Sequence, residues 1–396
     1  MRPDRSYVYG ATRTPIGRLH GDLSSLSAPW LAACAIEEAI RRSGVIPPHI
    51  SDVILGNVLS AGLGQAPARQ ALIQAGLPEG VRGMIVNKVC GSGLQAVVMA
   101  DNLIRLGEAE FVVAGGMESM SQAPFLHTRR HEEGRETSEP IDSLVYDGLW
   151  DSFGDCHMGH IAEDLAQHEP YSREAQDRYA LESYRRARQA QDDCLFSKEI
   201  VAVPVTREGK TAWIDKDEQP HAHDLDKLSR LPPAFEKEGG TVTAGNSSSI
   251  NDGAAVLVLG PFDDSLKPMA RIVAHASHSM PPSMFPLAPI YAIELLLEKW
   301  NLGKRDIDLY EINEAFAVTA MTVIDRMGLD PQRVNIHGGA VALGHPIGAS
   351  GARILFTLLH ALKARNEKRG IAAICVGGGE SVAVGVEMLD QEPGGD

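Results

Sequence analysis

The run Val89-Cys90-Gly91-Ser92-Gly93 stands between two different apolar patterns. Before it, residues 83–88 form a short apolar segment that predicts a strand. After it, apolar residues at three- and four-residue spacing over 94–106 predict a helix. A glycine-rich turn between a strand and a helix is typical of layered α/β proteins. We therefore expect the Cys90 thiol at a helix N-terminus, beside backbone that a ligand can approach closely.

A second turn, Gly348-Ala349-Ser350-Gly351, opens a later helical run. The first helix leads to the strand and turn Val113-Ala114-Gly115-Gly116-Met117-Glu118-Ser119, and the second leads to Cys375-Val376-Gly377-Gly378-Gly379-Glu380-Ser381. The order and the chemistry match, which indicates an internal duplication with two helix N-termini near a shared interface. Chance similarity between two such short segments is the alternative.

The rest of the chain repeats the alternation of short apolar runs with longer helical patterns, which predicts the α/β class. A polar, proline-bounded stretch at 261–268 is a candidate linker between two such units. Residues from about 121 to 240 interrupt the alternation with polar and charged sequence. A long excursion of this kind from a layered domain is usually functional, often as a lid or a ligand-gripping insert.

Composition limits the classes of protein that fit. The 396 residues are two to three times a typical domain of roughly 100–200 residues, so more than one core is expected. A net charge of −15 argues against general nucleic-acid or anionic-membrane binding, although an anionic small substrate needs only a local patch. No apolar run approaches a membrane span, and no signal-peptide core follows Met1. Five cysteines without a Cys-x-x-Cys pair favour a reducing compartment, so we expect a cytoplasmic protein.

Four residues are candidates for chemistry, and each has a structural alternative. A helix N-terminus favours a thiolate, so Cys90 is a candidate nucleophile; the alternative is a buried structural cysteine. His345, in a tight loop of small residues, suits a general base, or else only bonds backbone. Cys375 closes a buried-type strand, either as an acid/base or as a core cysteine. Asn313 is placed to hold a water or an oxyanion, or to cap a helix.

Together these segments resemble the thiolases, the acyl-CoA C-acyltransferases, over essentially the whole chain. The resemblance is carried by Thr12-Arg13-Thr14-Pro15-Ile16-Gly17, Pro67-Ala68-Arg69-Gln70, Gly115-Gly116-Met117-Glu118-Ser119-Met120, Thr243-Ala244-Gly245-Asn246, and by the Asn-Glu-Ala-Phe, Gly-His-Pro and Cys-x-Gly-Gly-Gly blocks. It implies two duplicated βαβαβαββ-type halves in an αβαβα arrangement with an inserted loop domain. The implied boundaries are 1–265, with the insert at about 120–245, and 266–396.

The resemblance also implies roles. Cys90 would carry the acyl group, His345 would take its proton, and Cys375 would exchange a proton with the α-carbon of the second acyl-CoA. His345 with an Asn313-held water would stabilise one thioester oxyanion, and the amides of Cys90 and Gly377 the other. The residues expected to contact the substrate and CoA are His157, Met158, Ala244, Ser248, Ala315 and Phe316.

Four segments depart from the family pattern. His221 and Pro232 stand where arginines are usual, so the CoA nucleotide must be held by other cations or more weakly. The family's Met-Gly-x-Gly-Pro loop appears as Met284-Phe285-Pro286-Leu287-Ala288-Pro289, with bulk in place of glycine, which bears on the acyl chain. The usual Gly-Gly-Gly-Met-Gly contains Glu380 and Ser381, for which a structural role is the simpler interpretation.

The resemblance of residues 141–151 is to the short-chain branch, which implies conversion of two acetyl-CoA to acetoacetyl-CoA and CoA. The alternatives are a longer-chain 3-ketoacyl-CoA thiolase and a non-catalytic lipid-binding relative. A β-ketoacyl synthase shares the fold but lacks a second cysteine, so Cys375 argues against it. No metal or cofactor is implied, no nucleic-acid or membrane partner is expected, and the family suggests a homodimer or homotetramer.

Overall fold

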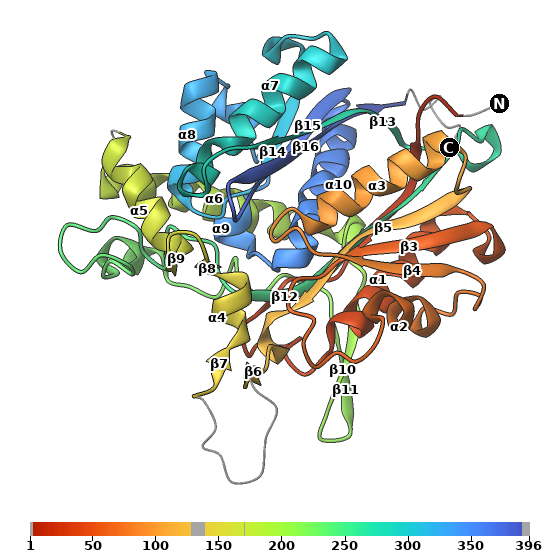
Figure 1. The fold of residues 1–396 in the computed structure, drawn as a ribbon, viewed down its shortest axis with the longest axis horizontal. Coiled ribbons are helices and arrows are strands. Elements are labelled where there is room, and N and C mark those ends of the chain that lie inside the picture. The colour runs from red at the N-terminus through yellow and green to blue at the C-terminus, as the bar shows by residue number, and fades with distance from the viewer. Residues whose placement is uncertain (1–2, 128–138, 170, 390–396) are drawn as a thin grey trace.

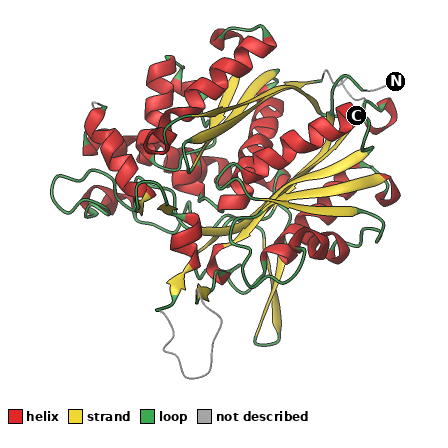
Figure 2. Ribbon diagram, in the orientation of Figure 1, coloured by secondary structure: helices red, strands yellow, loops and turns green. Residues whose placement is uncertain are grey.

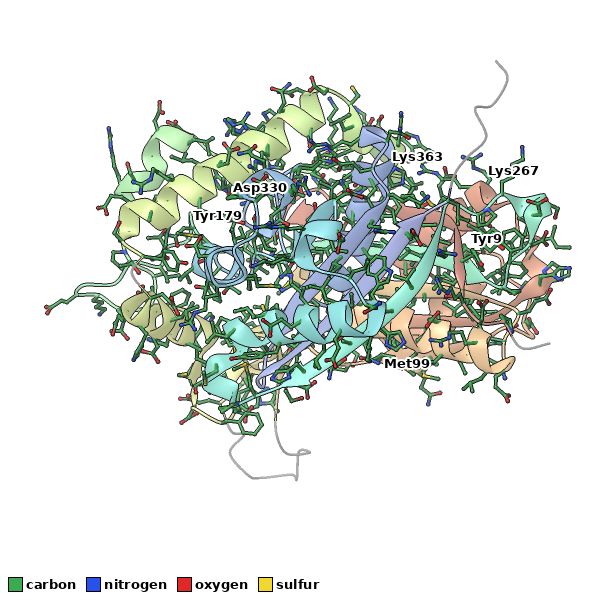
Figure 3. All side chains as sticks on the ribbon, turned by 90° about the horizontal axis from the view of Figure 1, so that it is seen from above. Tyr9, Met99, Tyr179, Lys267, Asp330 and Lys363 are labelled. Carbon is green, nitrogen blue, oxygen red and sulfur yellow. The ribbon has the colours of Figure 1, made fainter. Side chains whose placement is uncertain are left out.

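The structure is a computed structural model that describes residues 3–127, 139–169 and 171–389. Its helices and strands are interleaved along the chain, and Figure 2 shows helices lying against the strands. Side chains fill the space between the ribbons in Figure 3. Within the described ranges, every helix is too short or too polar to cross a membrane.

One large sheet organises the fold. Its strands lie in the order β14-β15-β16-β13-β1-β12-β5-β3-β4, with the short β2 (Gly17–Arg18) paired to β12. In chain order the main strands are β1 (Tyr7–Arg13), β3 (Ile50–Gly56), β4 (Arg82–Val86), β5 (Phe111–Ser119), β12 (Asn251–Gly260), β13 (Ala270–Ser279), β14 (Leu309–Ile312), β15 (Arg369–Val376) and β16 (Glu380–Met388).

The sheet has two matching halves. In the first, β3 and β5 are parallel, and β12 runs antiparallel to both β5 and β1. In the second, β14 and β15 are parallel, and β16 runs antiparallel to both β15 and β13. The two halves join where β1 meets β13 at Tyr7 and Val8. The repeated order confirms the predicted duplication and the α/β class.

Helices cover the sheet in layers (Figure 1). Between the two halves lie α3 (Ser92–Leu106) and α10 (Ile347–Arg365), and each contacts strands of both halves. The helices α1 (Ala28–Ser43) and α2 (Pro67–Gln74) cover the first half, whereas α7 (Ala288–Trp300) covers the second. Most of α10 is buried, as expected for a helix with packing partners on every side. Such an arrangement places the starts of α3 and α10 together in the centre.

One detail of the predicted duplication is wrong. The first copy has no turn at Gly115 and Gly116, because β5 continues straight through them to Ser119. These glycines serve close packing: a Cβ on Gly116 would lie 1.9 Å from the Gly348 carbonyl oxygen, and one on Gly115 would lie 2.0 Å from that of Ala255. In the second copy Gly378 and Gly379 do form a turn, with φ of +89° at each.

The chain leaves the sheet between β5 and β12 and folds into small hairpins and helices. These include α4 (Ser143–Gly148), α5 (Met158–His168), α6 (Arg173–Asp192), the 3-10 helix η4 (Leu225–Arg230), and the paired strands β6 (Phe125–Leu126) with β7 (Ile141–Asp142), β8 (Trp150–Asp151) with β9 (Cys156–His157), and β10 (Val203–Arg207) with β11 (Lys210–Ile214). After β14 follow α8 (Ala317–Met327) and α9 (Ala340–Leu343). The segment between β5 and β12 forms one side of the cavities described next.

Candidate active site

Cys90 lies directly before α3, in a strained loop. Its neighbour Val89 has a positive φ of 44°, which is rare for a β-branched residue and clusters at functional sites. Burial raises the pKa of Cys90 to about 11, although its own N–H and that of Gly377 hydrogen-bond the sulfur and oppose the rise. The sequence predicted that the helix start lowers this pKa; the backbone N–H groups do lower it, but burial raises it by more. Near neutral pH the side chain is a thiol and needs a base.

His345 lies in the tight loop before α10 and is buried. Its backbone N–H donates to Asn251 Oδ1 at 3.0 Å, and its ring Nδ1 is 2.6 Å from Ser350 Oγ. Ser350 donates its hydroxyl proton to the Pro346 carbonyl at 2.9 Å, so it accepts from the ring. The proton is then on Nδ1, and Nε2, buried and unbonded in the described chain, is left as the acceptor. Burial and Arg353 lower the pKa of His345 to about 3, which keeps the ring neutral.

Cys375 is buried on β15, one residue before the strand ends. Burial, followed by the proximity of Cys90, raises the pKa of its thiol well above the usual range. Gly377 lies two residues further along, in the turn to β16, and its N–H bonds the Cys90 sulfur. A Cβ on Gly377 would lie 3.5 Å from Val89 and 3.6 Å from Met158. The structure therefore brings Cys90, Cys375 and Gly377 together.

Asn313 follows β14 and is buried, but it caps no helix, because α8 begins only at Ala317 and Phe316 is its N-cap. Its backbone N–H donates to the Ala373 carbonyl of β15 at 3.0 Å. Both atoms of its side-chain amide lack a hydrogen-bond partner within the described residues. A buried amide without partners is costly in a folded protein, so this one is suited to a ligand or a water.

The next residue, Glu314, anchors the Asn313 segment. Its carboxylate accepts hydrogen bonds from Tyr179 Oη at 2.9 Å and Ser183 Oγ at 2.8 Å, both on α6, and from Asn335 Nδ2 at 2.9 Å. The backbone N–H of Val341 donates to it as well. Figure 3 labels Tyr179 on this helix. Within the Asn-Glu-Ala-Phe block, the Glu314 carboxylate is therefore hydrogen-bonded to surrounding elements, whereas the Asn313 side-chain amide has no partner in the described structure.

A narrow cavity of about 250 Å³ reaches the thiol, and we refer to it as the inner cavity. It is lined by predicted site residues from both halves and from the chain between β5 and β12: Cys90, His157, Met158, Ala244, Ser248, Ala315, Phe316 and His345. The His157 ring is fixed there, because its Nδ1 accepts the Gly159 N–H at 3.0 Å and it stacks on Phe235. Cys375, Asn313 and Gly377 do not line this cavity and lie behind its wall or in the adjoining turn.

A second, wider cavity of about 660 Å³, the outer cavity, shares four lining residues with the first: Ala244, Ser248, Ser249 and Ile250. The two therefore meet at this segment. Among the other residues of the outer cavity are two cations, Arg18 and Lys227, and one carboxylate, Asp224. Lys227 forms a 3.4 Å ion pair with Asp224, and its side chain is 73% exposed. The lining therefore carries two cations and one carboxylate, on a chain of net charge −15.

The residues at the family's arginine positions do not contribute to either lining. His221 Nε2 is instead 3.3 Å from Asp192 on α6, and Pro232 lies outside both cavities. Sequence reasoning missed the cations that do line the outer cavity. It also missed Ser350, Asn251 and Phe235. Ser350 had a local signal, because it follows His345 by five residues near the start of α10. Phe285 belongs to the loop whose bulk the sequence had already connected with the acyl chain.

The described residues contain no group of three or more His, Cys, Asp or Glu side chains arranged to hold a metal ion. All five cysteines are free thiols. The four predicted catalytic side chains therefore supply two thiols, one neutral imidazole and one unbonded amide, with backbone N–H groups beside them. This set can transfer protons and form a covalent thioester at Cys90.

Comparison with known proteins agrees with this site. Residues 6–262 match the family described as thiolase, N-terminal domain, and residues 266–388 match thiolase, C-terminal domain. The chain belongs to the thiolase family, a family of enzymes, and the resemblance seen in its sequence is confirmed.

Individual relatives are similar over their full length. An acetyl-CoA acetyltransferase of Thiocystis violacea is 46% identical over 98% of this chain and 100% of its own. One from Escherichia coli is 46% identical over 97% and 99%. Among solved structures, a Bacillus anthracis acetyl-CoA acetyltransferase superposes with a TM-score of 0.94 at 39% identity, covering 98% of this chain and 100% of that one. The Acat5 thiolase from Ascaris suum in complex with coenzyme A gives 0.91 at 42% identity, with the same coverage.

Proposed function

We propose that this thiolase transfers an acetyl group between two molecules of acetyl-CoA, forming acetoacetyl-CoA and CoA reversibly. The observation that carries the proposal is a pair of neighbouring thiols, Cys90 and Cys375. Of the two, Cys90 lines a narrow cavity together with the neutral buried imidazole of His345. The names of the relatives, acetyl-CoA acetyltransferases at about 45% identity, support the choice of substrate.

In the first half-reaction His345 Nε2 takes the proton of the Cys90 thiol, and the sulfur attacks the thioester carbon of acetyl-CoA. The bond from that carbon to the CoA sulfur breaks, and the departing thiolate takes the proton from His345. The raised pKa of Cys90 explains why a base is needed. Ser350 supports this role by holding the ring in the tautomer whose Nε2 accepts.

In the second half-reaction Cys375 relays a proton from the methyl carbon of a second acetyl-CoA to the Cys90 sulfur: it gives up its own thiol proton as it accepts the one from carbon. That carbon attacks the acetyl-Cys90 carbonyl, the carbon–sulfur bond breaks, and the Cys90 sulfur regains a proton, so protons balance overall. Oxyanions form in both half-reactions. The amides of Cys90 and Gly377 are proposed to hold one, and His345 with an Asn313-held water the other. The unbonded Asn313 amide supports this assignment.

We propose that CoA lies along both cavities, with its thiol end near Cys90 and its nucleotide in the outer cavity. His157, Met158, Ala244, Ser248, Ala315 and Phe316 would then contact the arm, since they line the inner cavity. Arg18 and Lys227 would face the phosphates in place of the missing arginines. Cations near phosphate groups form charge-assisted contacts, which fits this placement.

We propose further that the chain divides into domains at 1–265 and 266–396, with the insert at about 120–245, and that it works in the cytoplasm without a metal or cofactor. Free cysteines fit a reducing compartment. A homodimer or homotetramer is proposed because β4 is an edge strand with unpaired backbone on one side and Met84 44% exposed.

The test is mass spectrometry of the protein after exposure to acetyl-CoA. An acetyl adduct is expected on the Cys90 peptide and should be absent from Cys90→Ala, whose folding is checked by circular dichroism. An adduct that persists in this variant, or that maps to another residue, contradicts the proposed nucleophile.

A further inference from the structure

Phe285 is a buried aromatic side chain that belongs to the wall of the inner cavity. It lies in the 3-10 helix η6 (Pro282–Leu287), it is only 2% exposed, and it shares the lining with Cys90 and His345. Its neighbour Met284 points elsewhere: it is 41% exposed and does not line the cavity. Two adjacent residues of this loop therefore differ in the environment that their side chains meet.

The position of Phe285 within the cavity follows from what the two cavities share. They meet at Ala244 and the segment 248–250, which marks the entrance to the inner cavity. Phe285 lines the inner cavity only, as Cys90 does. It also packs in one apolar cluster with Cys375 and Phe316. Phe285 therefore belongs to the reacting end of the cavity and not to its entrance.

The loop that carries Phe285 is held rigidly. The Met280 N–H donates to the Gly379 carbonyl at 2.8 Å, which ties the loop to the turn that contains Gly377. The packing there is tight, since a Cβ on Gly379 would lie 2.2 Å from the Met280 carbonyl oxygen. Prolines at 281, 282 and 286 restrict the backbone further. The aromatic ring therefore has little freedom to swing aside for a longer substrate.

The inner cavity is also small. Ligand pockets commonly span roughly 300–1,000 Å³, whereas this one has about 250 Å³ for both the thiol end of CoA and the acyl group. We propose that Phe285 closes the acyl end of the cavity, so that the enzyme accepts two- and four-carbon acyl groups and rejects longer 3-ketoacyl chains. This inference rests on the proposed function and assigns the residue that limits its substrate range.

The experiment compares thiolysis of 3-ketoacyl-CoAs with four, six and eight carbons by the purified full-length protein. The wild type should cleave the four-carbon substrate and lose roughly tenfold or more in kcat/KM for each added methylene. In Phe285→Ala, the ratio of six-carbon to four-carbon kcat/KM should rise by about tenfold or more. Phe285→Leu, which preserves more of the packing, should give a smaller rise in the same direction.

Met284→Ala is the matched control, because it shortens the neighbouring side chain outside the cavity and should leave the ratio unchanged. Equal ratios in wild type, Phe285→Leu and Phe285→Ala overturn the inference, as does a wild type that cleaves six carbons as well as four. A wild type that cleaves none of the substrates contradicts the proposed function instead. If Phe285→Ala does not fold, the ratio in Phe285→Leu decides.

Discussion

The two halves of the sheet place different residues at equivalent points. In the first half, β3 pairs with β5 so that Gly56 faces Gly116. Counting on from this pair, Asn57 is one residue after Gly56, and Glu118 is two residues after Gly116. In the second half, Ile312 faces Ala373, and the equivalent residues are Asn313 and Cys375. Asn57 and Glu118 hydrogen-bond each other at 2.7 Å. The amide of Asn313 has no such partner in the described structure.

Further hydrogen bonds fix the Asn57–Glu118 pair. The Glu118 carboxylate also accepts the N–H groups of Val58, Leu59 and Gly348, the last of which belongs to the start of α10. It thereby ties the first half to the loop that carries His345. In the first half Asn57 Nδ2 is bonded and only Oδ1 lacks a partner within the described residues, whereas in the second half both amide atoms of Asn313 lack one. The comparison teaches that one scaffold position serves structure where a carboxylate binds its amide, and is available to chemistry where neither amide atom is bonded.

Cys375→Ala should have the largest effect on activity. Removing a proton-transfer group typically costs about 10²–10⁴-fold in rate, so condensation and thiolysis should fall by that much. Acetylation of Cys90 should persist, because Cys375 acts only in the second half-reaction. Rates of acetoacetyl-CoA turnover and the mass of the acyl-enzyme measure the two effects. Unimpaired turnover would show that Cys375 is as structural as Glu118.

His345→Ala should change how acylation depends on pH. In the wild type, His345 with a pKa of about 3 and Cys90 with a pKa of about 11 both keep one protonation state between roughly pH 6 and pH 9, so the rate should be flat. Without the base, only the thiolate fraction reacts. The rate should then be lower and should rise about tenfold per pH unit. Rapid-quench acylation across this range checks it, and a flat profile in the variant would exclude His345 as the base.

Glu118→Ala tests the structural role of the first half of the sheet. It would leave several buried donors unpaired at about 1–3 kcal/mol each, so the free energy of unfolding should fall by at least about 3 kcal/mol.

Asn313→Ala breaks no side-chain hydrogen bond within the described chain. Its free energy of unfolding should therefore stay within about 1 kcal/mol of the wild type while activity falls. Urea unfolding measures both. Equal losses of stability in the two variants would erase the distinction between the halves.

The smallest effect is expected at Glu380, which the sequence comparison had paired with Glu118. It lies past the turn, at the start of β16, and forms an ion pair with Lys88 in the Cys90 loop. The pair is partly exposed, so Glu380→Ala should cost no more than about 1 kcal/mol of stability. The exchanged pair Lys88→Glu with Glu380→Lys should recover that loss. A loss as large as that of Glu118→Ala would make the two glutamates equivalent after all.

Much of the site could be predicted from local pattern. The strand before Cys90, the helix after it and the tight loop at His345 all follow from apolar spacing and glycine content, which the backbone imposes on neighbouring residues. Local pattern also misled in one place: aligning segment 113–119 with segment 375–381 set Glu118 opposite Glu380, and these two residues are not structurally equivalent. Two segments of similar composition can differ in one turn. Here β5 runs through Gly115 and Gly116 in close contact with its neighbours, whereas the second copy turns at Gly378 and Gly379.

The amino-acid sequence alone specified the alternation of strands and helices, the duplicated order and the candidates Cys90, His345, Asn313 and Cys375. Only the tertiary structure determined which of their atoms are bonded, buried or left open. The pKa of Cys90 is raised and not lowered, because burial outweighs the helix terminus. Phe285 faces the cavity while Met284 faces solvent. Burial and hydrogen-bond satisfaction depend on residues far apart in the chain, and local spacing does not contain that information.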